Sequence, residues 1–147
     1  MDKEKFIEIM IIELTILGEP NAQMRHRSFK RGKFSGTYDP SSDKKNDFLS
    51  VIQQKAPKEP LEGPVGITII FYFGRPKSHY GTGAKSSMLK DNAPEFHTCK
   101  KDLDNCVKFA TDSMNHIFYK DDSQICRLFS EKLYSESPRT YILIQTL

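Results

Sequence analysis

Apolar and polar residues alternate over the first stretch of the chain, where residues Phe6 to Leu17 place Ile12, Leu14 and Ile16 on one face. A period of two residues predicts a β-strand with one face in the core. A second run, Val65 to Phe73, is apolar or aromatic at nearly every position. Such a run predicts a strand at the centre of a sheet, covered on both faces.

Two later segments, Ile125 to Tyr134 and Thr140 to Thr146, alternate in the same way. Turn-forming residues separate them at positions 137–139. We therefore expect these two segments to be strands that pair as an antiparallel hairpin.

Two other segments show the spacing of three and four residues that is typical of one helix face. The first begins at Ser41 or Ser42, either of which can cap a helix, and continues to about Lys55. The second runs from Asp102 to about Asn115. The residues expected to face the core are Phe48, Leu49 and Ile52 for the first helix, and Leu103, Val107, Ala110, Met114 and Ile117 for the second.

The predicted order is strand, helix, strand, helix, strand, strand. This order indicates an α+β fold, a single domain over residues 1–147 with two main helices packed on a small mixed β-sheet. Two long segments with little periodicity, residues 21–40 and 74–99, interrupt the pattern. Loops of this length are usually functional or disordered.

Acidic residues gather around the second predicted helix. Asp102 stands at its expected N-cap, Asp104 follows two positions later, and Asp121 and Asp122 come after the helix. Carboxylates at this spacing, joined by another from a neighbouring element, suit a hard cation such as Mg²⁺ or Mn²⁺. Asp102 also has a structural interpretation, because an N-cap carboxylate accepts hydrogen bonds from first-turn N–H groups. Asp112 is expected to point towards solvent.

Basic residues concentrate in two segments that flank this acidic helix. The net charge is only +3, but 11 of the 22 Lys and Arg residues lie between positions 18 and 34 or between 75 and 101. Cations around an acidic metal site supply affinity for a polyanion that the acids alone would repel. The aromatic residues between the first group of bases suit either stacking on nucleic acid or anchoring on the core. The candidate DNA-binding residues are Arg25, Arg27, Lys30, Arg31, Lys33, Lys77, Lys85, Lys100 and Lys101.

Other classes of protein find little support in the sequence. Cys99, Cys106 and Cys126 lack the paired spacing of a zinc site or a disulfide framework, so we expect reduced, partly buried thiols. The Gly81-Thr82-Gly83 segment lacks the context of a P-loop, and we expect no small-molecule organic cofactor. No apolar run is long enough to span a membrane and no secretory signal begins the sequence, so an intracellular protein is expected.

The motifs combine into a larger pattern. Residues 100–108 read Lys-x-Asp-Leu-Asp-Asn-x-x-Lys, residues 121–125 read Asp-Asp-Ser-Gln-Ile, and Lys132 follows. Gly-Glu-Pro stands at residues 18–20 and Arg-Pro-Lys-Ser-His-Tyr-Gly-Thr-Gly at residues 75–83. Together these motifs resemble the RusA-type Holliday-junction resolvases of phages and prophages. The last motif is similar to the form found in phages of Gram-positive bacteria.

The resemblance implies a structure-selective endodeoxyribonuclease that resolves four-way DNA junctions by paired nicks, in recombination and repair. It implies that Asp102, Asp104 and Asp122 bind Mg²⁺, with Mn²⁺ as a substitute, and that Lys108 assists catalysis. Asp121 is either a further ligand or a turn residue. The implied partners are branched DNA and a second copy of the chain, since two strands must be cut. The implied location is the cytoplasm of a bacterial or phage-infected cell.

Two positions depart from the family pattern. Lys101 stands where the family usually has Pro or Arg, and Gln23 stands where many relatives carry Lys, which removes one expected phosphate contact. The alternative hypothesis is a non-catalytic protein of the same fold that binds branched DNA. A small-molecule phosphohydrolase is disfavoured by the many basic residues of the two segments.

Overall fold

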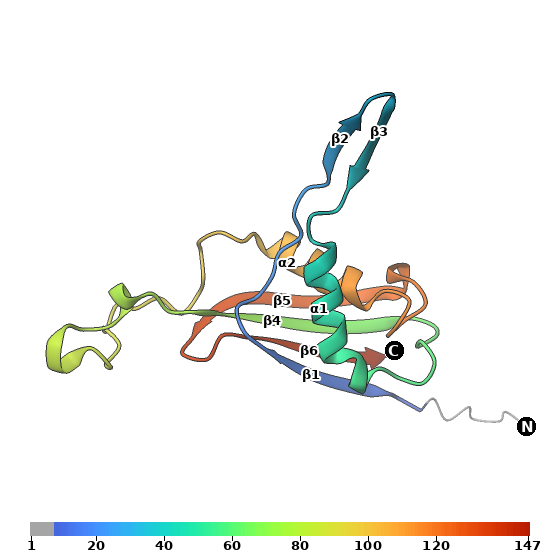
Figure 1. Ribbon diagram of the computed structural model, residues 1–147. Helices are drawn as coiled ribbons and strands as arrows, with labels where there is room; N and C mark the ends of the chain where they lie inside the picture. The colour runs from blue at the N-terminus through green and yellow to red at the C-terminus, as the bar shows by residue number, and fades with distance from the viewer. Residues whose placement is uncertain (1–7) are drawn as a thin grey trace, which may run out of the picture.

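The computed structural model describes residues 8–147, so positions 6 and 7 of the first predicted strand lie outside the described residues. Two helices pack on a mixed sheet, and a separate two-stranded hairpin projects from this body (Figure 1). The α+β fold predicted from the sequence is confirmed. In chain order the elements are β1 (Ile11–Leu17), β2 (Arg27–Arg31), β3 (Phe34–Tyr38), α1 (Ser42–Ile52), β4 (Val65–Gly74), α2 (Leu103–Met114), β5 (Ile125–Ser135) and β6 (Arg139–Thr146).

The main sheet has the strand order β1-β6-β4-β5, in which only the β4–β5 pair is parallel. The predicted hairpin of the last two strands is therefore wrong, because β5 and β6 lie on opposite sides of β4. The strongly apolar β4 takes the central position and separates them. Residues 136–138 suffice to cross its end, since two strand spacings are about 10 Å and an extended residue spans about 3.5 Å.

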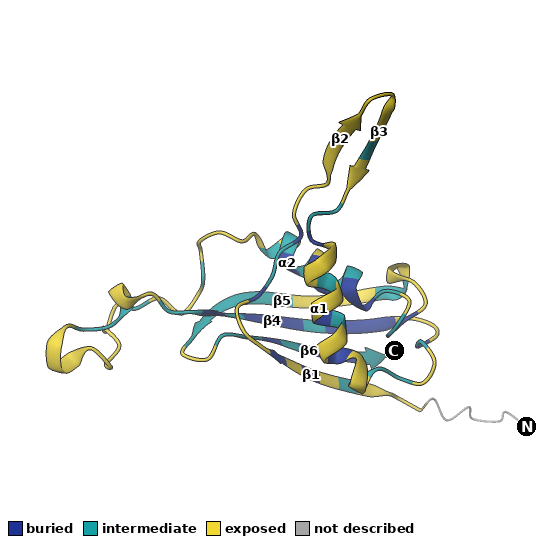
Figure 2. Ribbon diagram, in the orientation of Figure 1, coloured by how far each residue is buried: buried dark blue, intermediate teal, exposed yellow. Residues whose placement is uncertain are grey.

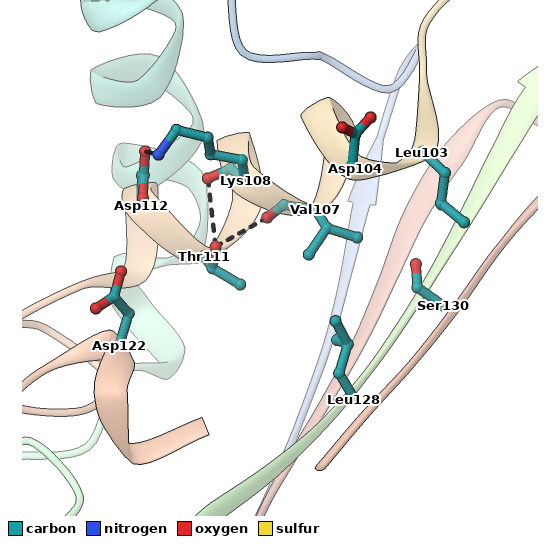
Figure 3. A pocket seen from close by; sticks show the side chains of 9 residues that line it. All are labelled: Leu103, Asp104, Val107, Lys108, Thr111, Asp112, Asp122, Leu128 and Ser130. Carbon is teal, nitrogen blue, oxygen red and sulfur yellow. Dashed lines mark hydrogen bonds and ion pairs between the residues drawn. The ribbon is translucent and has the colours of Figure 1, made fainter. Parts of the chain in front are cut away.

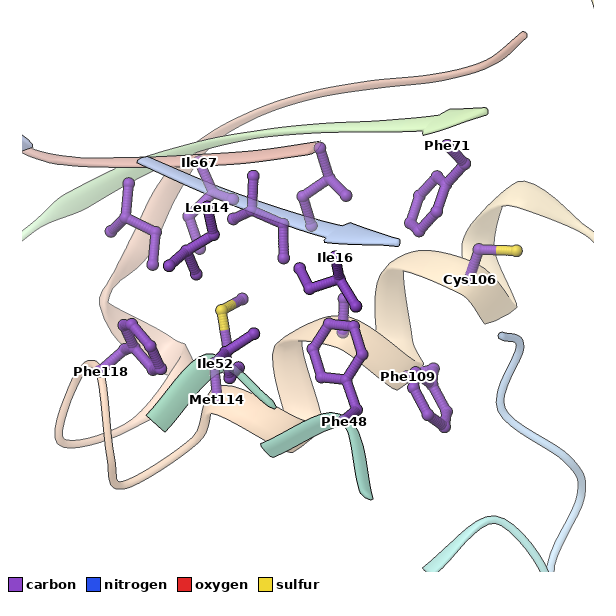
Figure 4. Close-up of a cluster of buried hydrophobic side chains, with 14 of the residues drawn as sticks. Leu14, Ile16, Phe48, Ile52, Ile67, Phe71, Cys106, Phe109, Met114 and Phe118 are labelled. Carbon is purple, nitrogen blue, oxygen red and sulfur yellow. The ribbon is translucent and has the colours of Figure 1, made fainter. Parts of the chain in front are cut away.

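The hydrophobic core lies between the helices and one face of the sheet (Figure 4). The odd-numbered side chains of β4 pack in this core with Leu14 and Ile16 of β1 and with Ile142 and Ile144 of β6. Leu14 and Ile16 thus lie on the face of β1 that the two-residue period assigned to the core. Phe48 of α1 and the aromatic ring of Phe109 on α2 touch edge to face, with centroids 5.6 Å apart. These contacts fix α2, and the acidic residues it carries, against the sheet.

Helix α2 begins and ends within one residue of its predicted bounds, but its buried face is rotated about the helix axis relative to the predicted face. The fully buried side chains are Cys106, Phe109, Ala110, Ser113 and Met114. Leu103 and Val107, expected in the stripe, are only half-buried. The buried face differs because α2 packs on α1 as well as on the sheet, so that Phe109 is buried against Phe48 of α1. The side of α2 that carries Leu103 and Val107 lies beside a cavity instead.

The three cysteines are free thiols, as expected, but the expected partial burial is wrong. Cys99 and Cys126 are exposed, whereas Cys106 is completely buried. Burial raises the pKa of the Cys106 thiol to about 11, so this residue acts as a small apolar side chain in the core.

The segment at residues 21–40 is not the long loop that the sequence predicted. It contains β2 and β3, which pair antiparallel through a two-residue turn at Gly32-Lys33. Gly32 has a φ of 56°, the left-handed conformation that such turns require and that glycine adopts without strain. Nearly the whole hairpin is exposed (Figure 2). Its strands show no buried–exposed alternation, which is why the two-residue period was not visible.

The second long segment, predicted at residues 74–99, has no helix or strand between the end of β4 and α2 apart from two 3₁₀ turns, Lys77–His79 and Gly83–Lys85, and isolated β-bridges. It returns to the sheet edge where the Tyr134 N–H donates to the Glu95 carbonyl at 2.9 Å. The His97 ring stacks on Phe73 with centroids 3.8 Å apart, and burial lowers the pKa of this histidine. A stacked neutral imidazole anchors the segment just before α2. Among residues 8–147, no helix is both long and apolar enough to cross a membrane.

Candidate active site

A cavity of about 690 Å³ opens between α2, the turn that follows it, and β5 (Figure 3). One part of its wall is apolar and the other is polar and charged. The lining residues are Leu103, Asp104, Val107, Lys108, Thr111, Asp112, Asp122, Leu128 and Ser130. The flank of α2 that the rotated stripe leaves open thus forms one side of the cavity.

Asp104 and Lys108 lie one turn apart on α2, and both side chains are exposed on the cavity wall. The Asp104 carboxylate accepts a hydrogen bond from the Asn105 N–H at 2.9 Å. The first turn of α2 adds the positive end of the helix dipole, which attracts negative charge to this part of the cavity wall.

Asp122 reaches the same cavity from the 3₁₀ turn Asp122–Gln124, which precedes β5. Its neighbour Asp121 caps that turn: the Asp121 carboxylate accepts from the Ser123 N–H, and the Gln124 side chain accepts from the Asp121 N–H. Hydrogen bonds from Ser123 lower the pKa of Asp121. Asp121 is therefore a turn residue here, and its capping role fixes the position of Asp122.

Asp102 occupies the N-cap position of α2, as predicted, but its carboxylate accepts no cap hydrogen bond from the described backbone. The structure thus contradicts the interpretation of Asp102 as a hydrogen-bonding cap. The residue is exposed and is not among the residues that line the cavity. Its oxygens remain available to a ligand at the start of the helix.

The acidic side chains can be tested for their fit to a metal ion. Asp104, Asp112 and Asp122 present only oxygen donors to one cavity, and oxygen is the donor that Mg²⁺ and Mn²⁺ prefer. Within residues 8–147, no group of three or more His, Cys, Asp or Glu side chains is arranged to hold a metal ion. The donor chemistry fits a hard divalent cation held by few protein ligands and several waters.

Asp112 was expected to point towards solvent, and this prediction is wrong. Its side chain is 25% exposed and lies 3.4 Å from the ammonium groups of both Lys108 and Lys45. Lys45, on α1, also lies 2.7 Å from Asp39 at the end of the hairpin. Sequence reasoning missed Lys45, because Asp39 lies six residues before it, outside α1, and Asp112 lies 67 residues away on α2, so no helix spacing brings the three together.

Asp39 is the best-satisfied carboxylate of this cluster. Its burial would raise its pKa, but hydrogen bonds from Lys45, from the Ser41 N–H and from Gln23 lower the pKa to about 2. The Ser41 hydroxyl in turn accepts from the Met24 N–H at 2.8 Å. Both strands of the hairpin are thereby fixed to the N-terminus of α1.

A comparison with protein families matches residues 18–145 to the family described as endodeoxyribonuclease RusA. The chain belongs to the RusA family. It is also 37% identical over 137 residues to the uncharacterized protein YqaN of Bacillus subtilis strain 168, a match that covers 91% of this chain and 95% of the relative. The resemblance noted in the sequence is therefore confirmed, and the family is one of endonucleases that resolve Holliday junctions.

Gln23, one of the departures from the RusA pattern, has a structural role. Its side chain donates to Asp39 at 2.8 Å and its backbone N–H donates to the Asn105 carbonyl of α2 at 2.8 Å. Gln23 also lines a second cavity, of about 310 Å³, that shares Lys108 with the first. In this RusA protein the glutamine ties the base of the hairpin to the helix that carries the acids.

The predicted DNA-binding residues of this RusA protein are all exposed. Arg25, Arg27, Lys30, Arg31 and Lys33 lie on or next to the hairpin, Lys77 and Lys85 lie in the 3₁₀ turns beyond β4, and Lys100 and Lys101 precede α2. Lys101, the other departure, donates to the Pro20 carbonyl at 2.6 Å. Within residues 8–147 the remaining eight form no ion pair, so their charges are available to a polyanion.

Proposed function

We propose that this protein is a divalent-metal-dependent endodeoxyribonuclease that resolves four-way DNA junctions by paired symmetric nicks, acting as a homodimer. The observation that supports it most is the shared cavity of Asp104, Lys108 and Asp122, flanked by exposed basic side chains on two segments. Family membership supports the substrate class. A junction with two-fold symmetry that is cut on two strands calls for two related sites, hence a dimer. We place the activity in the cytoplasm of a bacterial or phage-infected cell.

In this proposal Asp102, Asp104 and Asp122 hold Mg²⁺, or Mn²⁺ in its place. The bound metal supplies a more acidic water and charge stabilisation at the scissile phosphate. Without a cation the three carboxylates repel the phosphates of the DNA backbone.

Lys108 is proposed to neutralise the negative charge that develops on the phosphate. Its side chain is 59% exposed, whereas that of Lys45 is 16% exposed, and both contact Asp112. When Lys108 turns towards a phosphate, Asp112 keeps Lys45 as its partner. An exposed ion pair is worth about 1 kcal/mol or less, so releasing Lys108 costs little.

The alternative, a branched-DNA-binding protein that does not cleave, predicts that the acids are dispensable. The Asp102 carboxylate, which accepts no hydrogen bond from the first turn of α2, favours the nuclease. An unpaired acid beside phosphate weakens DNA binding unless a cation accompanies it.

The test uses a labelled four-way junction and a duplex of equal length, each incubated with Mg²⁺, with Mn²⁺ or with chelator. We expect paired nicks on the junction alone, abolished by chelator and by Asp122→Asn while junction binding persists. Asp47→Asn, an exposed acid on α1, is the matched control. Tight binding without cleavage in either metal would establish the alternative, and a sedimentation mass of one chain would refute the dimer.

A further inference from the structure

The register of β2 and β3 gives the hairpin two unlike faces. Directly opposed residues of an antiparallel pair point to the same side, and alternate residues point to opposite sides. One face carries only arginine, aromatic and glycine residues, in the pairs Arg27–Tyr38, Phe29–Gly36 and Arg31–Phe34. The other face is small and polar apart from one lysine, with Ser28, Lys30, Ser35 and Thr37.

The aromatic rings of the first face are exposed rather than packed on the body. Phe34, beside the turn, is 80% exposed, Tyr38 is 47% exposed and Phe29 is 43% exposed. The Phe29 ring lies across Gly36, where an added Cβ would come within 3.0 Å of the ring. Glycine thus leaves room for the outer edge of the ring on the opposite strand. The hairpin presents a preformed aromatic surface, which is unusual for a segment in contact with water alone.

Charge indicates what this face binds. Residues 24–38 contain five Lys and Arg residues and no Asp or Glu. A surface of this kind favours a polyanion over a second copy of a chain whose net charge is +3. Arginine and aromatic side chains together are the groups on which unpaired nucleobases stack.

The chemistry of the face also distinguishes unpaired from paired bases. A two-stranded ribbon in the major groove of a duplex reads base edges with hydrogen-bonding side chains. Phe29 and Phe34 offer no such groups, and the ring faces of bases inside a duplex are covered by their neighbours. The faces become accessible where base pairs open, as they can at a branch point, where the helical stack is interrupted.

The base of the hairpin adjoins the candidate active site. Gln23, Arg25 and Lys108 line one cavity, and Asp39, at the end of the hairpin, shares Lys45 with Asp112. A five-residue strand spans about 17 Å, so the tip stands about that far from this cavity. A base held at the tip is therefore within a few nucleotides of a phosphate held at Lys108.

We propose that the arginine–aromatic face of the hairpin binds unpaired DNA bases at the branch point, with Phe34 as the stacking residue at the tip. The face then recognises a junction by its separated strands, while Lys30 and Lys33 contact the backbone. This inference rests on the proposed function for the identity of the substrate, but the binding itself needs neither metal nor cleavage.

The experiment measures binding by fluorescence anisotropy in chelator, using a labelled single strand, a duplex, and four-way junctions with or without two unpaired thymines at the branch. Phe34→Ala should weaken binding to the single strand and to the junction with unpaired thymines by about tenfold, in line with the known cost of losing one stacked base, and change duplex binding by less than about twofold. Phe34→Leu, which keeps the apolar bulk without the ring, should lose most of the same affinity.

Two further variants separate stacking from charge. Lys30→Gln, on the opposite face, should weaken binding to single strand and duplex alike and reduce the salt dependence by about one ion. Val51→Ala, an exposed apolar residue on α1, is the matched control for loss of surface and should bind every DNA as the unmodified protein does.

Three outcomes would overturn the inference. Equal losses of Phe34→Ala on single strand and duplex would assign the residue to general backbone contact. An unchanged affinity for every DNA would exclude any contact at Phe34. A conversion of dimer to monomer in the same variant would show that the face packs on a second copy of the chain. Absence of junction cleavage by the unmodified protein is a separate result, which counts against the proposed nuclease and leaves these binding differences measurable.

Discussion

Lys45 connects the hairpin to the candidate active site, and replacing it tests that connection. Its ammonium lies 2.7 Å from Asp39 and 3.4 Å from Asp112. Lys45→Met removes the charge and keeps most of the apolar stem. The matched control is Lys44→Met, which removes a neighbouring charge of the same helix that has no ion-pair partner within residues 8–147.

The size of the effect follows from the pKa of Asp39, which falls from 3.8 to about 2. At about 1.4 kcal/mol for each pH unit, this change corresponds to about 2 kcal/mol. Burial opposes it, and the stabilising groups are Lys45, the Ser41 N–H and Gln23. We assign about half to Lys45 and add a few tenths for its longer pair with Asp112. Lys45→Met should therefore lower the free energy of unfolding by about 1–2 kcal/mol at pH 7.

The effect should depend on pH in one direction. The pKa of Asp39 is lower in the folded protein than in the unfolded chain, so its ionised form stabilises the fold above about pH 4. That stabilisation is lost as the pH falls from 3.8 through 2, and well below pH 2 the carboxylate is protonated in both states. The difference between Lys45→Met and the unmodified protein should shrink over the same range.

Urea unfolding followed by circular dichroism measures these free energies, since the chain has no tryptophan. A double-mutant cycle with Asp39→Asn should give a coupling of about 1 kcal/mol. If Lys45→Met behaves as Lys44→Met does at every pH, or the cycle shows no coupling, the proposed link between hairpin and helix is refuted.

Two further predictions concern the core beneath the site. A thiol reagent at pH 8 should modify Cys99 and Cys126 in the folded protein and Cys106 only after unfolding, because burial raises the pKa of Cys106 to about 11. Rapid modification of all three thiols in the folded protein would contradict the burial of Cys106. Phe109→Ala should lower the free energy of unfolding by about 3–5 kcal/mol and Phe109→Leu by clearly less, as measured by urea unfolding, because the ring is 2% exposed and packs against Phe48. Equal costs would mean that the aromatic contact adds nothing.

The fold was predictable wherever burial imposes a period on the sequence. The strand at Val65–Gly74 and the helix at Leu103–Met114 were predicted almost to the residue, because one face of each is in the core. The hairpin escaped prediction because both of its faces are exposed. Its signal was instead the two-residue turn with Gly32 between segments of equal length.

The candidate site was predictable only in part, for a related reason. Asp104, Lys108 and Asp122 reach one cavity because α2 and the turn after it are close in sequence, and local spacing could bring them together. The surroundings of Asp112 depend on Lys45, 67 residues away on another helix. The pairing of β5 with β4 rather than with β6 likewise depends on competition between distant strands, which alternation within each strand does not record.

The place of β6 in the sheet bears on the order in which the protein can assemble. Among residues 8–147 this strand is synthesised last, yet it lies between β1 and β4, with Ile12 opposite Ile144. Until β6 leaves the ribosome, β1 has no neighbouring strand in the sheet, and α1 has only part of the sheet to pack on. Contacts so distant in sequence also slow folding. The full sheet is therefore completed late, after the whole described chain is available, and a nascent fragment without β6 lacks the strand that joins β1 to β4 beneath the helices.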